Sequence, residues 1–407
     1  MPGMGGAAIR SQVQANGFSG HHEPGGKRRH GNTATDGANE SANATFPRVH
    51  GRRKLRRGIR IGGQPQPAGK NCKPAQPQRR NHGSGAGRGS PRMSVGNGSP
   101  RKPKALKTGS RVAVFAPASP ADSVEMIAGL AELKRQGFQV VANQDSKADG
   151  YFAGPALDRM NGFLSGIQSE QIDGLVALRG GYGSNYLLEF DLAKNLEKPK
   201  SVIGFSDLTT LQIYLWQKCG WVTFYGPMVA AGINAGARAA KGYDDNSFLQ
   251  AIGKAEAGWK LRLKGEAVLT GQAMGRVLGG AMTLVEATIG TPWELDTKDS
   301  ILILEDRGMK PYQVDRVLMH LKQAGKFEGV KGIVLGEFPD SPPAVAGAPT
   351  VREVCARILR PLGIPIVFGA AVGHTERPML TFPLGIKARL DAEGEGTLEF
   401  LEPAVTP

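Results

Sequence analysis

The folded part of this chain opens with Arg111-Val112-Ala113-Val114-Phe115-Ala116-Pro117, an apolar run that predicts a buried strand. Residues 123–137 follow, and their apolar positions, among them Met126, Leu130 and Leu133, recur with the period of a helix. The same alternation continues through predicted strands at 138–142, 174–178 and 201–204 and predicted helices at 156–167, 185–196 and 208–218. Such a repeat is typical of a mostly parallel sheet with helices on both faces.

A second α/β pattern begins after residues 235–270, where the periodicity weakens. Its predicted strands lie at 300–304, 332–336 and 364–368, its helices at 311–324 and 350–362, and a closing β pair at 386–400. Because no internal repeat is apparent, we expect a second domain rather than a solenoid. The predicted organisation is an N-terminal Rossmann- or flavodoxin-like domain at 108–234, a linker at 235–270 and a smaller C-terminal α/β domain at 271–407.

The net charge of +15 comes from an N-terminal tail. The first 110 residues contain 21 of the 51 basic and 3 of the 36 acidic residues, a net charge of +18, so the remainder carries −3. The tail is rich in Gly, Asn, Gln, Ser and Pro and lacks a periodic apolar run, so it cannot bury enough apolar surface to offset its chain entropy. We therefore expect residues 1–107 to be disordered.

The role of this tail stays open. A basic arm can bind nucleic acid or an anionic surface, but we expect no specific nucleic-acid binding because the interleaved aromatic residues that stack on bases are missing. Arg52-Arg53 and Arg56-Arg57 resemble an export signal, but no long apolar run follows them, so we expect no signal peptide. Alternatively, the tail is a translated upstream region and Met93 is the true start.

Membrane spans, disulfides and metals are not expected. No apolar stretch approaches the roughly 18 residues that cross a bilayer. The three cysteines, Cys72, Cys219 and Cys355, show no paired spacing, which argues against a disulfide framework and against a zinc site. We expect a soluble protein of the reducing cytoplasm.

Ser206 follows the predicted strand at 201–204 and precedes the helix that opens at Leu208. Its hydroxyl should therefore lie at the carboxyl end of a strand, where open α/β sheets place their ligands. The segment is similar to a nucleophile elbow but lacks the Gly-x-Ser-x-Gly spacing. Alternatively, Ser206 or Asp207 merely caps the helix.

The segment Arg179-Gly180-Gly181-Tyr182-Gly183 also lies between a predicted strand and a predicted helix. Its glycines allow close backbone approach and leave amides exposed. It is either an oxyanion hole or anion-binding turn, or simply a tight turn. A dinucleotide fingerprint fits poorly, because the first strand ends in Ala116-Pro117-Ala118-Ser119-Pro120.

A carboxylate and an imidazole follow two strands of the second pattern. Glu305 and Asp306 end the apolar run 301–304, where a carboxylate can orient an imidazole or pair with Arg307. His374 lies in a Gly-flanked turn that exposes it for proton transfer, although an isolated His there can be incidental. A hydroxyl, a carboxylate and an imidazole at apparent strand ends are the inventory of a serine hydrolase.

Taken together, these segments resemble one family, the LD-carboxypeptidases of the serine peptidase S66 group, which includes muropeptide-recycling enzymes and microcin C immunity hydrolases. The similarity extends from Gly109 to Glu402 and rests on the order and spacing of several motifs. These motifs are 114–120, 179–183, 204–209, Gly279-Gly280 with Gly290-Thr291-Pro292, 304–306, 311–316, 332–338, Gly373-His374 and Pro383-Leu384-Gly385.

The resemblance implies a role for each site residue. Ser206 would be the nucleophile, His374 the general base and Glu305 the carboxylate that orients His374, so the triad would span both domains. The oxyanion hole would come from the backbone N–H of Asp207 and of a glycine after Arg179, with Gly181 preferred over Gly180. The reaction would pass through an acyl-enzyme and need no metal or organic cofactor.

The implied substrate is the peptidoglycan tetrapeptide, cleaved between the L-centre of its diamino acid and the terminal D-Ala. A carboxypeptidase must hold a free carboxylate, so we expect a cationic group near the cleft. Two departures bear on the substrate. Family members commonly have His before Gly-Pro where this chain has Tyr225, and Asn after the Gly-Gly pair where this chain has Ala281.

Two alternatives remain. The first keeps the triad but cleaves aminoacyl- or peptidyl-nucleotide conjugates of the microcin C type, with Trp293 as the candidate to stack on a base unless it is a core residue. The second makes the chain an inactive nucleic-acid or surface-binding protein that uses its basic tail. Family members are often dimers, so the resemblance also allows a homodimer.

Overall fold

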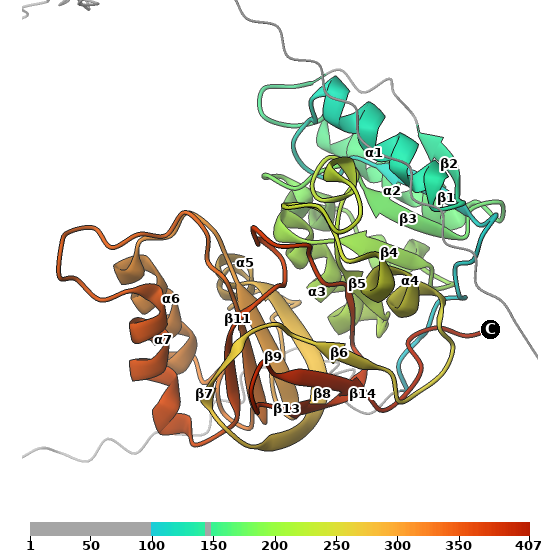
Figure 1. The fold of residues 1–407 in the computed structure, drawn as a ribbon. Coiled ribbons are helices and arrows are strands. Elements are labelled where there is room, and N and C mark those ends of the chain that lie inside the picture. Colours follow the sequence, from blue (N-terminus) through green and yellow to red (C-terminus); the bar gives the residue numbers. More distant parts are fainter. Residues whose placement is uncertain (1–98, 143–147) are drawn as a thin grey trace, which may run out of the picture. The chain divides into compact units, whose positions relative to one another are not determined.

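The computed structural model describes residues 99–142 and 148–407 (Figure 1). Most of the predicted tail, residues 1–98, lies outside the described residues. Residues 99–107, the described end of the predicted tail 1–107, pack against the rest of the chain. Leu106 is buried, Arg101 forms a β-bridge with Trp221, and Lys104 forms one with Thr406.

The first sheet has six strands. Their order is β12 (Phe382–Leu384), β5 (Thr223–Tyr225), β4 (Ser201–Gly204), β3 (Gly174–Ala177), β1 (Arg111–Phe115) and β2 (Gln139–Ala142). The strands β1 to β5 are parallel, and β12 runs antiparallel to β5 with Phe382 opposite Tyr225. Every residue of β3 and β4 is buried, as expected for strands covered on both faces.

Helices lie against this sheet (Figure 1). They are α1 (Ser123–Arg135), α2 (Ala156–Gln168), α3 (Thr209–Cys219) and α4 (Asp245–Gly253). The Asp122 side chain caps α1, and Gly220 ends α3 in the left-handed conformation. The prediction of one helix over 185–196 was wrong: the structure has two 3₁₀ helices, Ser184–Glu189 and Leu192–Asn195, because the backbone is extended at Phe190 between them.

The second sheet has eight strands. Their order is β6 (Lys260–Arg262), β14 (Thr397–Phe400), β13 (Lys387–Asp391), β8 (Gln272–Ala281), β9 (Ser300–Glu305), β10 (Gly332–Gly336), β11 (Ile366–Ala370) and β7 (Glu266–Leu269). The central strands β8 to β11 are parallel and the outer pairs are antiparallel. The helices are α5 (Met282–Ala287), α6 (Pro311–Gln323) and α7 (Val351–Leu359) (Figure 1). Their buried faces form a second core with the sheet.

The predicted mixed α/β fold, with two sheets flanked by helices, is confirmed. Residues 235–270, predicted as a linker, contain α4 and the strands β6 and β7, which pair within the second sheet. The strand β12, from the C-terminal part of the chain, completes the first sheet. The chain thus crosses between the sheets more than once, and the domain boundaries stay a prediction.

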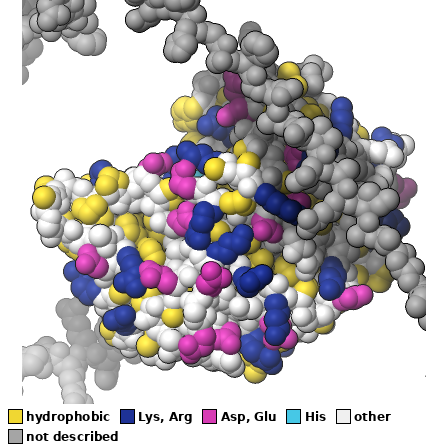
Figure 2. Space-filling model, viewed as in Figure 1, with side chains coloured by type: hydrophobic (Ala, Val, Ile, Leu, Met, Phe, Trp, Pro, Cys, Tyr) yellow, Lys and Arg dark blue, Asp and Glu magenta, His cyan; other side chains and the backbone are white. Residues whose placement is uncertain are grey.

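The described surface carries both signs of charge. On the face shown in Figure 2, acidic and basic side chains are interspersed, which agrees with the small net charge of the sequence beyond the tail. No helix within 99–142 and 148–407 combines the length and the apolar character that a bilayer span requires.

The two sheets approach closely at Gly280, near the end of β8. Its φ is +143°, and a Cβ at this position would lie 2.6 Å from Thr209 Oγ1 and 3.0 Å from Tyr225 Cε2. The hydroxyl of Thr209 also accepts the N–H of Ala281 at 3.1 Å. A glycine is therefore required here both by its backbone conformation and by its neighbours.

Replacing Gly280 by Ala should destabilise the protein. We expect the free energy of unfolding to fall by about 3 kcal/mol, because an unfavourable φ and overpacking add together. The matched control is Gly290→Ala, since Gly290 has φ +82° but nothing within 4 Å of an added Cβ. Denaturant titration should show a loss of only about 1 kcal/mol for the control. Equal losses would show that the close approach contributes nothing.

Candidate active site

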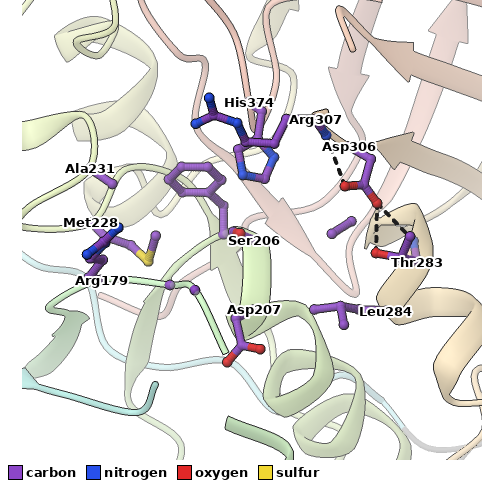
Figure 3. Close-up of a pocket in the computed structure, with 14 residues that line it drawn as sticks. Arg179, Ser206, Asp207, Met228, Ala231, Thr283, Leu284, Asp306, Arg307 and His374 are labelled. Carbon is purple, nitrogen blue, oxygen red and sulfur yellow. Dashed lines mark hydrogen bonds between the residues drawn. The ribbon is translucent and has the colours of Figure 1, made fainter. Parts of the chain in front are cut away.

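One cavity, of about 360 Å³, brings together residues from both sheets (Figure 3). The predicted site residues that line it are Ser206 and Asp207 after β4, Gly180 and Gly181 after β3, and His374 after β11. The remaining predicted residue, Glu305, contacts His374 directly. The cavity therefore lies at the carboxyl ends of parallel strands, the usual ligand position in open α/β sheets.

Ser206 occupies a strained turn between β4 and the helix that follows. Its φ is +59°, in the left-handed region that non-glycine residues rarely adopt, while Phe205 before it is extended. Such strain is concentrated at functional sites. The alternative that Ser206 or Asp207 caps the helix was wrong, because the residue at the N-cap of α3 is Leu208 and no side chain caps it.

Glu305 is the last residue of β9, and its side chain is 0% exposed. Its Oε2 accepts two hydrogen bonds from His374, from the backbone N–H at 2.9 Å and from Nδ1 at 2.8 Å. Gly373 makes this contact possible, because a Cβ there would lie 2.2 Å from the Glu305 carboxyl carbon. Of the two predicted acids, Glu305 therefore pairs with the imidazole.

Asp306 has different partners. Its Oδ2 accepts from the N–H and the hydroxyl of Thr283, at 3.0 and 2.8 Å, and its Oδ1 accepts from the N–H of Arg307 (Figure 3). Burial and the neighbouring charge of Glu305 raise the pKa of Asp306. Asp306 thus forms part of the cavity wall, and among the described residues its carboxylate makes no hydrogen bond to His374.

The second oxygen of Glu305 binds a residue to which sequence reasoning gave no role. Tyr225, at the end of β5, donates its hydroxyl to Glu305 Oε1 at 2.5 Å and is fully buried. Burial and the charge of Glu305 raise the pKa of Tyr225 well above its ordinary value, so the phenol keeps its proton. The sequence feature that could have pointed to Tyr225 is its position at the end of a strand beside β4. The sequence does not show that its hydroxyl reaches the other sheet.

The charge states of the pair follow from these contacts. Burial alone would raise the pKa of Glu305, but His374 and the Tyr225 hydroxyl hold it below the ordinary carboxyl value. Burial alone would lower the pKa of His374, but the charge and hydrogen bond of Glu305 raise it above 6.5. The pair therefore combines an ionised carboxylate with an imidazole that can readily take up a proton.

Ser206 and His374 face the same cavity (Figure 3). Among the described residues, no hydrogen bond joins the Ser206 hydroxyl to the imidazole. The ring of Phe205 packs edge-on against His374, with centroids 5.1 Å apart. In ligand-free enzymes such hydrogen bonds are often long and tighten only when substrate binds.

The glycines after Arg179 lie next to Ser206. A Cβ at Gly180 would lie 3.2 Å from Ser206 Oγ, and Gly181 has φ +101°. The Asp207 carboxylate points away from the imidazole (Figure 3) and accepts from the N–H and hydroxyl of Ser184 at 2.8 and 2.6 Å. Only the backbone of Asp207 is therefore positioned to serve the cavity.

Two arginines, Arg179 and Arg307, line this cavity and an adjoining one of about 490 Å³. Arg307 forms an ion pair with Asp340 at 2.5 Å. Arg179 Nη1 donates to the carbonyl of Pro120 at 3.0 Å, and among the described residues its other N–H groups have no hydrogen-bond partner and can bind a ligand. Both cavities include His374, so a bound chain has space on either side of the imidazole.

The described residues show neither a metal site nor a place for Trp293 in the cavities. In the part of the chain that the structure describes, no group of three or more His, Cys, Asp and Glu side chains could hold a metal ion. Trp293 packs against Tyr214, with ring centroids 5.8 Å apart, at the edge of the first core. It lines neither of the two cavities.

Residues 112–226 match the N-terminal domain model of the LD-carboxypeptidases, and residues 274–390 match the C-terminal domain model. A probable murein peptide carboxypeptidase of Bacillus subtilis is 32% identical over 311 residues, which cover 73% of this chain and 94% of that protein. The microcin C7 self-immunity protein MccF of Escherichia coli is 26% identical over 322 residues, covering 71% of this chain and 93% of that protein.

Solved structures show the same fold. The muramoyltetrapeptide carboxypeptidase of Oxalobacter formigenes matches with a TM-score of 0.65 at 26% identity, covering 73% of this chain and all of that chain. MccF in complex with aspartyl sulfamoyl adenosine matches with a TM-score of 0.68 at 25% identity, covering 75% of this chain and all of that chain. The chain therefore belongs to the LD-carboxypeptidase family of serine peptidases.

Proposed function

We propose that this enzyme releases the terminal D-Ala from peptidoglycan-derived tetrapeptides, with Ser206 as nucleophile, His374 as general base and Glu305 as the orienting carboxylate. The observation that carries the proposal is the buried Glu305–His374 pair at the wall of the cavity that Ser206 enters. The names of two relatives, a murein peptide carboxypeptidase and a muramoyltetrapeptide carboxypeptidase, support this substrate class.

The proposed reaction uses His374 through its outer nitrogen. Because Nδ1 faces Glu305, Nε2 is the atom left to take the proton from the Ser206 hydroxyl as the oxygen attacks the scissile carbonyl. The resulting oxyanion would be held by the backbone N–H groups of Asp207 and of Gly181 or Gly180. His374 then passes the proton to the leaving amine of D-Ala and activates the water that hydrolyses the acyl-enzyme.

Glu305 would act electrostatically in this scheme. During attack the imidazole becomes a cation in a site that is largely closed to water, since the His374 side chain is only 13% exposed. An ionised carboxylate at 2.8 Å stabilises that cation and fixes the orientation of the ring. The contribution is large because the interaction is buried.

The terminal carboxylate of the substrate would bind Arg179. This arginine lines the cavity, and most of its donors are not used by the one hydrogen bond to Pro120. Arg307 is less suited because Asp340 already neutralises it. A guanidinium binds a carboxylate with two parallel hydrogen bonds, which would favour an exopeptidase over an endopeptidase.

We further propose that the enzyme acts in the cytoplasm, on peptides recovered from the cell wall. Cys219 and Cys355 are free thiols, which suits a reducing compartment. The homodimer expected from the family resemblance stays a prediction that light scattering of the native protein can test.

Replacing Ser206 by Ala should abolish turnover without unfolding the protein. We expect kcat for D-Ala release from the tetrapeptide to fall by at least about 10³-fold, because the nucleophile is lost. Ser165→Ala, on an exposed turn of α2, is the matched control and should leave kcat unchanged. Quantitative mass spectrometry of the product checks both, and near-normal activity of Ser206→Ala would reject the covalent mechanism.

The carboxylate assignment predicts a difference between two substrates. We expect the wild-type enzyme to prefer the free tetrapeptide acid over its C-terminal carboxamide, and Arg179→Gln to lower kcat/KM for the acid by about 10- to 100-fold with little effect on the amide. Arg389→Gln, on β13 of the second sheet and outside both cavities, is the control. An equal loss on both substrates would show that Arg179 does not bind the carboxylate.

A further inference from the structure

We propose that Tyr225 is a positioning residue for catalysis, which holds the Glu305–His374 pair in its active arrangement from the opposite sheet. This inference rests on the proposed function, because it assigns Tyr225 a role through His374 as the base. It concerns the residue before Gly226-Pro227, at the end of β5.

The hydroxyl of Tyr225 is fixed in place from several sides. Its ring packs against Phe205 and Phe382, with centroids 6.3 and 5.5 Å away. Its oxygen donates to Glu305 Oε1 at 2.5 Å and lies 3.4 Å from the backbone N–H of Ser206, which donates to it. One phenol therefore contacts both the carboxylate of the relay and the backbone of the nucleophile.

The contact completes the hydrogen bonding of a buried charge. His374 supplies both of its donors to Oε2 of Glu305, so Oε1 depends on Tyr225. A buried carboxylate oxygen without a donor is costly. By sharing its proton with Oε1, Tyr225 disperses the charge and limits how tightly the pair holds a proton on the imidazole.

Tyr225 also joins the two sheets at this point. It lies at the end of β5 in the first sheet, whereas Glu305 ends β9 in the second. A phenol is suited to this position, because it donates a hydrogen bond without carrying a charge of its own near the imidazole. A second histidine there would add a group that titrates in the same pH range.

The role of Tyr225 can be measured from the acid limb of the plot of kcat/KM against pH, where activity rises as His374 loses its proton. His374 must lose its proton to act as base. The charges of Glu305, Asp306 and Arg307 act on its pKa, and Tyr225 acts on it through Glu305. Removing the Tyr225 hydroxyl leaves more negative charge on Glu305, so the pair binds its proton more tightly. In a variant without this hydroxyl, the acid limb of kcat/KM should therefore move to higher pH.

The test compares Tyr225→Phe with wild type on the tetrapeptide. We expect the acid limb to rise by about one pH unit and kcat to fall by about 10-fold or more, with KM changed less than about threefold. Tyr214→Phe is the matched control, since it removes a buried hydroxyl that contacts the N–H of Ala193 and not the relay. Its acid limb should coincide with that of wild type.

A second substitution keeps the shape of the residue and guards against misfolding. Tyr225→3-fluorotyrosine makes the phenol a stronger donor, so the acid limb should move to lower pH, opposite to the effect of Phe. Limbs that coincide with wild type in both variants would overturn the inference while leaving the proposed function intact. A wild-type enzyme that releases no D-Ala would overturn the proposed function and this inference together.

Discussion

The fully buried carboxylate of Glu305 is the constraint on which the rest of the site depends. An ionised group taken out of water costs several kcal/mol unless partners compensate it. Here the compensation comes from three donors, two on His374 and one on Tyr225. Tyr225 ends β5 of the first sheet and His374 follows β11 of the second, far away in the sequence, so the charge is tolerated only when the whole arrangement has formed.

Glycines make this arrangement sterically possible. Gly336 and Gly373 lie so close to Glu305 that an added Cβ at either would overlap it, and Gly280 lets β8 approach Thr209 and Tyr225. At the other side of the cavity, Ser206 carries a backbone strain that a glycine would avoid. A serine at position 206 lowers local stability relative to glycine, and this is expected if its hydroxyl is needed for the reaction.

Much of the fold and of the site could be predicted from the sequence. Apolar runs bounded by turns located the central strands, and the residues after them pointed to Ser206, Glu305 and His374. The crossing of β12 into the first sheet could not be predicted, because strand pairing between distant segments leaves no local pattern. Tyr225 was noticed only as a departure from the family, since its role depends on a contact between sheets. The 3₁₀ helices after Gly183 have apolar positions like those of an α-helix, and only the non-helical backbone at Phe190 and Asp191 separates them.

The control of His374 by the buried charge of Glu305 can be measured directly as the pKa of His374, by NMR titration of its imidazole in the wild-type protein and in Glu305→Gln. We expect a pKa above the ordinary value of 6.5 in wild type, because the carboxylate outweighs burial. In Glu305→Gln it should fall below 6.5, because burial then lowers the pKa more than the remaining charge of Asp306 raises it. The same pKa in both proteins would contradict the claim that a buried charge on Glu305 controls the imidazole.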